Sequence, residues 1–100
     1  MILAKPENIE AFTARGWWGT STIDDLFRAR VSERGDAEAV IDPINRPAVY
    51  GGHPRRLSWN ALADEVARMA GVLHGLGLRK DDVVLSQLPN SVEQYVAYLA

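Results

Sequence analysis

The strongest constraint on the fold is an apolar stripe that recurs at helical spacing between residues 59 and 73. A period of 3.6 brings the following side chains to one face: Trp59, Leu62, Ala63, Val66, Met69, Ala70 and Leu73. Ser58 stands directly before the stripe, where its hydroxyl can cap a backbone N–H of the first turn. Ala61 stands where a Glu would complete a capping box. The pattern predicts a long helix after Ser58 with one buried face.

The segment from residue 21 to 35 predicts an earlier helix. Ser21 or Thr22 can cap it, and two acids follow, which suits the positive end of a helix dipole. The apolar face consists of Ile23, Leu26, Phe27 and Val31. Gly35 can end this helix.

Two short apolar runs predict strands. The first is "EAVID", residues 38–42, which a Pro follows, and the second is "VVLSQL", residues 83–88. A loop rich in Pro and Gly follows the first run, and residues 48–50 within it are a further strand candidate. Gly75 and Gly77 suit left-handed turns after the long helix.

The turn "LPNSVE", residues 88–93, predicts the start of a last helix. Asn90 can cap it, and Glu93 stands where a capping box needs an acid. The apolar face of this helix comprises Val92, Tyr95, Val96 and Leu99. The helix reaches residue 100 without a cap, which favours a piece of a larger protein.

Strands and helices therefore alternate, which predicts an α/β fold of about three helices with two to four short strands. We expect it to be a fragment of a larger sheet-and-helix domain, because sheets average more strands than these. Residues 1–19 lack periodicity and predict an irregular arm that ends in the pair Trp17 and Trp18. Residues 20–100 would form the first part of the domain.

Composition narrows the class of protein. The chain has 100 residues and 47% apolar content, which is about one soluble domain. Its net charge of −2 comes from interspersed signs, so nucleic-acid binding is not expected. It has no cysteine, which fits a reducing compartment, and no run suited to a signal peptide or membrane span. The expected location is the cytoplasm.

The residue types that carry most chemistry are sparse and scattered. His53 and His74 are too few and too distant in the sequence for a metal motif. His74 is expected to be a surface or boundary residue, and His53 a loop residue with no evident partner. The pairs Asp24-Asp25 and Asp81-Asp82 suit a helix start and a turn, because neighbours on a helix do not share a face. The serines have no adjacent base, and no glycine-rich phosphate loop occurs.

One anion-binding possibility lies in the "LPNSVE" turn, where a helix N-terminus follows a strand. We favour a structural interpretation, because Asn90 and Glu93 can satisfy the free N–H groups there. The sequence therefore assigns no catalytic, cofactor-binding or metal-binding residue.

The stretch "LSWNALADEVARMAGVLHGLGLRKDDVVLSQLPNSVEQYVAYLA", residues 57–100, closely resembles the early part of adenylate-forming enzymes. In these acyl-CoA synthetases and acid–AMP ligases, a Ser/Thr-Tyr/Trp-x-x-Leu helix, a Gly-to-Asp turn into a strand, and an "LPNS-x-E" turn follow in that order. Residues 17–42 resemble the piece before it. The "SQLPN" form is most similar to members that act on aryl or alicyclic acids. The loop 43–56 and Ala61 depart from the pattern.

The resemblance implies a parent enzyme that activates a carboxylic acid with ATP and Mg²⁺, then passes the acyl group to coenzyme A. The family's catalytic motifs would lie beyond residue 100, so none is transferred here and the piece alone is expected to be inactive. Its partners would be the rest of the parent and, through uncovered apolar faces, a second copy. The alternative is a standalone α/β interaction module without catalytic activity. Which acid is used, whether coenzyme A is the acceptor, and the parent's oligomeric state stay open.

Overall fold

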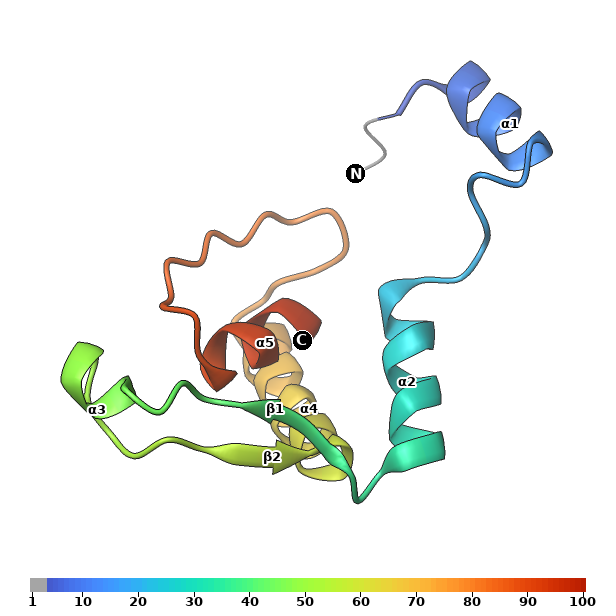
Figure 1. Cartoon of the computed structure of the whole chain (residues 1–100). Helices are drawn as coiled ribbons and strands as arrows, with labels where there is room; N and C mark the ends of the chain where they lie inside the picture. Colours follow the sequence, from blue (N-terminus) through green and yellow to red (C-terminus); the bar gives the residue numbers. More distant parts are fainter. Residues whose placement is uncertain (1–3) are drawn as a thin grey trace.

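A computed structural model describes residues 4–100, and these form a mixed α/β structure, as the sequence predicts. The elements in chain order are α1 (Pro6–Ala14), α2 (Ile23–Arg34), β1 (Glu38–Ile41), α3 (Arg46–Val49), β2 (Arg56–Ser58), α4 (Trp59–Gly75) and α5 (Val92–Leu99) (Figure 1). The helices are more numerous than expected, because α1 and α3 were not predicted. None of the helices within residues 4–100 is long and apolar enough to cross a membrane.

The sheet is one antiparallel pair. Strand β1 pairs with β2 in a register that places Val40 opposite Leu57 and Ile41 opposite Arg56, with an irregularity before Val40. The chain between the strands contains the short helix α3, so the expected strand at 48–50 is wrong. Pro47 near the start of this helix has no N–H to give to a sheet, which favours the helical turn.

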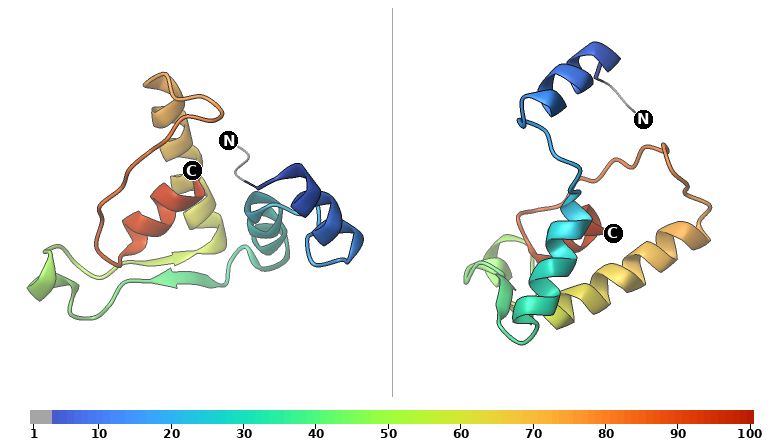
Figure 2. Two further views of the ribbon diagram at one scale, coloured as in Figure 1. Left: turned by 90° about the horizontal axis from the view of Figure 1, so that it is seen from above. Right: turned by 90° about the vertical axis from the view of Figure 1, so that its right-hand side faces the viewer.

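Helix α4 is the element around which the others assemble. It begins after Ser58, whose hydroxyl accepts a hydrogen bond from the Ala61 N–H at 3.2 Å, as predicted. It packs against α2, α5 and both strands (Figure 2). Its apolar stripe supplies Leu62 and Val66 to the buried core, which also contains Phe27, Val92 and Val96. The core is therefore small and centred on one face of α4.

Helix α2 confirms its predicted limits. Thr22 and Asp25 form a reciprocal capping box at its start, and Gly35 ends it. The Gly35 carbonyl accepts a hydrogen bond from the Asn60 N–H at 2.9 Å. A Cβ at Gly35 would lie 2.6 Å from the amide end of the Asn60 side chain, so a larger residue here would require that side chain to move.

Two predictions differ from the structure. Residues 6–14 of the predicted irregular arm form helix α1, which Figures 1 and 2 show set apart from the hairpin and α5. Residues 1–3 of that arm lie outside the described part, and the domain boundary at residue 19 stays a prediction. Residues 83–88 are not in a sheet, because no strand of the described chain pairs with them. Gly77 has the expected positive φ of 95°, whereas Gly75 still belongs to α4.

The core position Leu62 offers a test of this packing. Leu62 is 3% exposed, and we expect Leu62→Ala to lower the free energy of unfolding by about 3 kcal/mol because it leaves a cavity. Val72→Ala on the exposed face of α4 should cost less than about 1 kcal/mol. Urea unfolding followed by circular dichroism measures both. Equal losses in the two variants would contradict the assignment of the core face.

Candidate functional site

The most highly organised group of polar side chains surrounds Asp42, directly after β1. The Asp42 side chain is 0% exposed. Its Oδ1 accepts a hydrogen bond from the Val92 N–H at 2.8 Å, at the start of α5. Its Oδ2 accepts from the Arg55 N–H at 2.9 Å and from the Arg46 guanidinium at 2.6 Å. One carboxylate therefore joins three segments: α3, the residue that precedes β2, and the start of α5.

The charged state of Asp42 depends on these donors. Burial raises the pKa of the Asp42 carboxyl, but the hydrogen bonds from the Val92 and Arg55 N–H groups and from Arg46 outweigh it. The pKa consequently lies below its ordinary value. Asp42 is thus a buried anion at neutral pH, and it is held in that form by partners from three segments.

Alternating charges continue from Asp42 toward the surface. Arg46 donates to both carboxylate oxygens of Glu93, at 3.0 and 2.8 Å. Arg55 donates to Glu65 on α4 and, at 3.5 Å, to Glu93. The Arg46 ion pair lowers the pKa of Glu93 to about 2, and Glu93 in turn raises the pKa of Arg46. We call these five residues, Asp42, Arg46, Arg55, Glu65 and Glu93, the charge cluster.

The neighbouring turn is fixed by α3. The Tyr50 hydroxyl donates to the Asn90 carbonyl at 3.0 Å, and the Arg46 guanidinium lies 5.4 Å from the centre of the Tyr50 ring. Arg46 Nε also donates to the Gly51 carbonyl at 3.2 Å. Helix α3 thereby holds the residues that precede α5 as well as the helix itself.

The prediction that Asn90 caps α5 and that Glu93 closes a capping box is wrong. Ser91 is the N-cap and makes no side-chain cap hydrogen bond, while Glu93 pairs with Arg46 instead of closing a capping box. The first N–H of α5 is bound by Asp42, which is 50 residues away in the sequence. The Ser91 hydroxyl is buried, and it contributes to the lowered pKa of Glu93. An internal carboxylate therefore occupies the place considered for an external anion.

Neither histidine belongs to the charge cluster. His53 lies exposed in the loop before β2, and His74 lies exposed in the last turn of α4. Within residues 4–100, no group of three His, Cys, Asp or Glu side chains could hold a metal ion.

The paired acids serve local structure. Asp24 forms an ion pair with Arg28 at 2.7 Å, one turn along α2, and Asp25 belongs to the capping box. The Asp82 carboxylate accepts a hydrogen bond from the Arg79 N–H at 2.7 Å, within the turn after α4. These are the helix and turn roles expected from the sequence.

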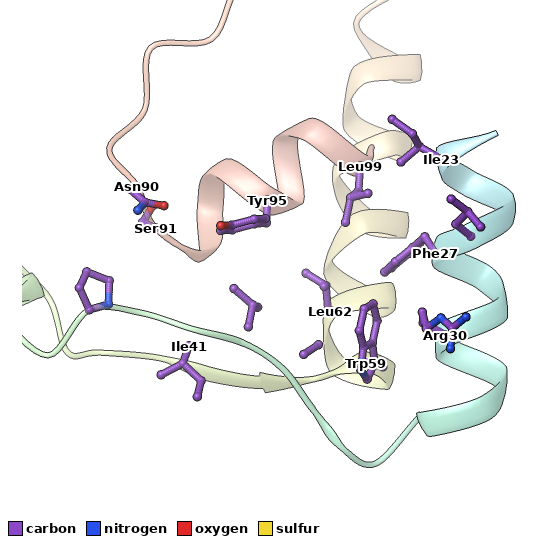
Figure 3. A pocket seen from close by; sticks show the side chains of 14 residues that line it. Ile23, Phe27, Arg30, Ile41, Trp59, Leu62, Asn90, Ser91, Tyr95 and Leu99 are labelled. Atoms are coloured by element: carbon purple, nitrogen blue, oxygen red, sulfur yellow. The ribbon is translucent and has the colours of Figure 1, made fainter. Parts of the chain in front are cut away.

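An apolar cleft of about 610 Å³ lies beside the charge cluster (Figure 3). It is bounded by α2, β1, α4 and α5, and its larger side chains include Ile23, Phe27, Ile41, Trp59, Tyr95 and Leu99. Arg30 is the cation in its lining, and Asn90 and Ser91 stand at the α5 end. This lining suits packing against apolar groups. It offers no nucleophile next to a base.

Comparison with known proteins establishes the protein family to which this chain belongs. Residues 27–100, which span from α2 to the end of the chain, match the family model of the AMP-binding enzymes. This chain belongs to that family. The resemblance found in the sequence is therefore confirmed.

Two of the similar curated proteins are named for ligase or synthetase activities. A salicyl-AMP ligase / salicyl-S-ArCP synthetase of Mycobacterium tuberculosis is 37% identical over 90% of this chain and 15% of its own length. An acetyl-coenzyme A synthetase of Rubrobacter xylanophilus is 42% identical over 67% of this chain and 10% of its own length. The chain thus spans only about 10 to 15% of the relatives it matches. No solved structure matches it.

The charge cluster predicts a large cost for losing the buried charge. Asp42→Asn removes the negative charge that pairs with Arg46 and replaces one carboxylate oxygen, an acceptor, by an NH₂ donor. We therefore expect the free energy of unfolding to fall by about 3 kcal/mol. Asp64→Asn, on the exposed face of α4, should change it by less than about 0.5 kcal/mol. Urea unfolding gives both values, and amide exchange at Val92 reports the contact itself. A Val92 amide equally protected in Asp42→Asn would contradict the assigned role.

Acid should weaken the Glu93 ion pair. The pKa of Glu93 is lowered from 4.5 to about 2, so its stabilisation is complete above pH 4.5 and is lost as the pH falls toward 2. Because its side chain is 40% exposed, we expect Glu93→Gln to cost about 1 kcal/mol at pH 7. The difference from the unmodified chain should shrink as the pH falls toward 2 and vanish below it, whereas Asp64→Asn should follow the unmodified chain throughout. A difference that stays the same from pH 5 to pH 2 would count against the ion pair.

Proposed function

We propose that this chain is the N-terminal structural segment of an ATP-dependent carboxylic acid ligase. The parent would form an acyl-adenylate and then a thioester with coenzyme A. Membership of the AMP-binding enzyme family supports this proposal, as do the printed activities of the relatives, a salicyl-AMP ligase and an acetyl-coenzyme A synthetase. We further propose a cytoplasmic location, which suits soluble substrates of this class.

The observation that carries the proposal is the coincidence of the family match with the packed part of the chain. The match begins at Phe27 and continues to residue 100, and this range contains the whole buried core and the charge cluster. Helix α1 lies before it. The matched region is therefore a unit whose own interactions hold its elements together.

The charged side chains within this unit are better suited to a structural role than to binding a substrate or to catalysis. Arg46 and Arg55 could in principle bind a triphosphate, but each is already paired with carboxylates of the chain. The residues present do not fit a nucleotide site. We therefore place ATP, Mg²⁺ and coenzyme A on other parts of the parent and propose that the 100-residue piece alone is inactive.

The decisive measurement for the parent is acid-dependent exchange of labelled pyrophosphate into ATP. A protein whose reading frame contains this segment, followed by a phosphate-binding loop, should show exchange with at least one acid of a broad panel that includes aryl and short aliphatic acids. The 100-residue chain should show none. Absence of exchange with every acid in the panel would overturn the ligase proposal.

A second candidate function is a standalone interaction module, and one observation favours it. Trp17 is 65% exposed and Trp18 is 42% exposed, and both pack on Phe12 of helix α1. Exposed aromatic residues of this kind are common in protein interfaces. The reading frame distinguishes the two candidates: a phosphate-binding loop downstream supports the ligase segment, and a stop codon at position 101 supports the module.

A further inference from the structure

The peptide bond between Asp42 and Pro43 differs from every other bond of the chain, because no other Asp of the sequence stands directly before a Pro. An X–Pro bond is a tertiary amide, and its nitrogen accepts a proton and leaves more readily than the nitrogen of an ordinary peptide bond. A carboxyl oxygen of Asp42 can also close a five-membered ring onto the carbonyl carbon of its own residue. This bond therefore combines a good leaving group with a neighbouring nucleophile.

The fold occupies both oxygens of this nucleophile. Oδ1 of Asp42 accepts a hydrogen bond from the Val92 N–H at 2.8 Å. Oδ2 accepts from the Arg55 N–H at 2.9 Å and from the Arg46 guanidinium at 2.6 Å. Attack on the carbonyl carbon requires an oxygen to give up these charge-assisted hydrogen bonds. The side chain is also 0% exposed, so the water that would complete hydrolysis does not reach it.

The backbone is fixed on both sides of the bond. The Asp42 N–H donates to the Arg55 carbonyl at 2.9 Å, and the Pro43 carbonyl accepts from the Arg46 N–H at 3.0 Å. Pro43 itself is exposed, whereas Asp42 is buried. Solvent therefore contacts the residue that would leave, and the protection of the bond lies with the buried carboxylate.

We propose that the Asp42–Pro43 bond is an acid-sensitive self-cleavage site that the charge cluster keeps intact. In the reaction, an Asp42 carboxyl oxygen forms a bond to the carbonyl carbon of Asp42, and the bond from that carbon to the Pro43 nitrogen breaks. The nitrogen takes up the proton that the carboxyl gives up. One water molecule then opens the cyclic anhydride, which yields residues 1–42 and residues 43–100 as the two products. This site goes beyond the proposed ligase role and does not depend on it.

The charge of Asp42 adds to this protection, because the carboxyl must carry a proton to supply one to the nitrogen. Burial raises the pKa of Asp42, but the hydrogen bonds from the Val92 and Arg55 N–H groups and from Arg46 outweigh burial and hold the pKa below the ordinary 3.8. At pH 3.8 about half of the Asp42 carboxyls are protonated in the unfolded chain. In the folded chain the larger share stays charged and unreactive.

The 100-residue chain incubated at pH 3.8, with and without urea, tests the site. We expect intact-mass spectrometry to show products 1–42 and 43–100 in urea and a much slower appearance of both in the folded chain, because cleavage follows the population of the open form. Circular dichroism verifies that the sample without urea is folded. Equal rates in the two samples would overturn the protection, and an uncleaved bond in urea would overturn the site.

Asp42→Glu identifies the reacting group under conditions in which folding plays no part. The extra methylene enlarges the ring that must close, so the variant should show no cleavage at this position in urea while the unmodified chain is cut. Cleavage of Asp42→Glu at the unmodified rate would show hydrolysis without the side chain and contradict the proposal.

A matched pair of variants tests the charge cluster. Arg46→Gln removes a donor to Asp42 and should speed cleavage without urea about tenfold. Arg28→Gln removes an exposed guanidinium that pairs with Asp24, and it should change the rate by less than about twofold. Both variants should match the unmodified chain in urea. Equal acceleration in the two variants would contradict the role of the cluster.

Leu62→Ala separates local protection from overall stability, because it weakens the core without removing a donor to Asp42. For the same loss in the free energy of unfolding, Arg46→Gln should accelerate cleavage more than Leu62→Ala does. This comparison holds even where Arg46→Gln is strongly destabilised. Cleavage rates that follow the free energy of unfolding alone in both variants would overturn the specific protection by Arg46.

Discussion

The arrangement of this chain depends on one buried carboxylate. A buried anion is costly unless several donors satisfy it, and Asp42 has three: the first N–H of α5, the Arg55 N–H and the Arg46 guanidinium. Each donor belongs to a different part of the chain. The requirement to satisfy the charge therefore fixes where α5 begins relative to the hairpin, which apolar packing alone would leave free to slide.

The apolar face of α4 supplies the complementary constraint. Leu62 and Val66 contact the surrounding elements without directional preference, whereas the charge cluster selects one alignment of them. Glu65 connects the two systems, because it lies on α4 beside the apolar stripe and pairs with Arg55. Hydrophobic burial thus supplies most of the cohesion, and the ion pairs determine the position of the helix start.

The sequence predicted the elements whose causes are local. The helix that begins after Ser58, the helix ended by Gly35, and the strand at residues 38–41 each follow from a cap, a period or a β-branched run. Helix α1 was missed because its apolar residues are few, although Pro6 at its first position and Glu7 in its first turn are helix-start signals.

The candidate site could not be predicted in the same way. Asn90 and Glu93 stand at the right spacing for a local cap, but the preferred partners come from residues 42 and 46, and no short-range pattern encodes that choice. A signal was nevertheless present, because an Asp directly after a strand is followed by an Arg four residues later. This spacing can bring the two side chains together as an ion pair, as it does for Asp42 and Arg46.

The segment 83–88 shows the opposite case, in which local preference is clear and the partner is absent. The amino-acid composition of residues 83–88 indicates only that the backbone can be extended and that the side chains suit the surface of a pleated sheet. Pairing also needs a second edge, and the only sheet within residues 4–100 is completed by β1 and β2. The strand predicted at residues 83–88 therefore has no neighbouring strand to pair with in the described part of the chain.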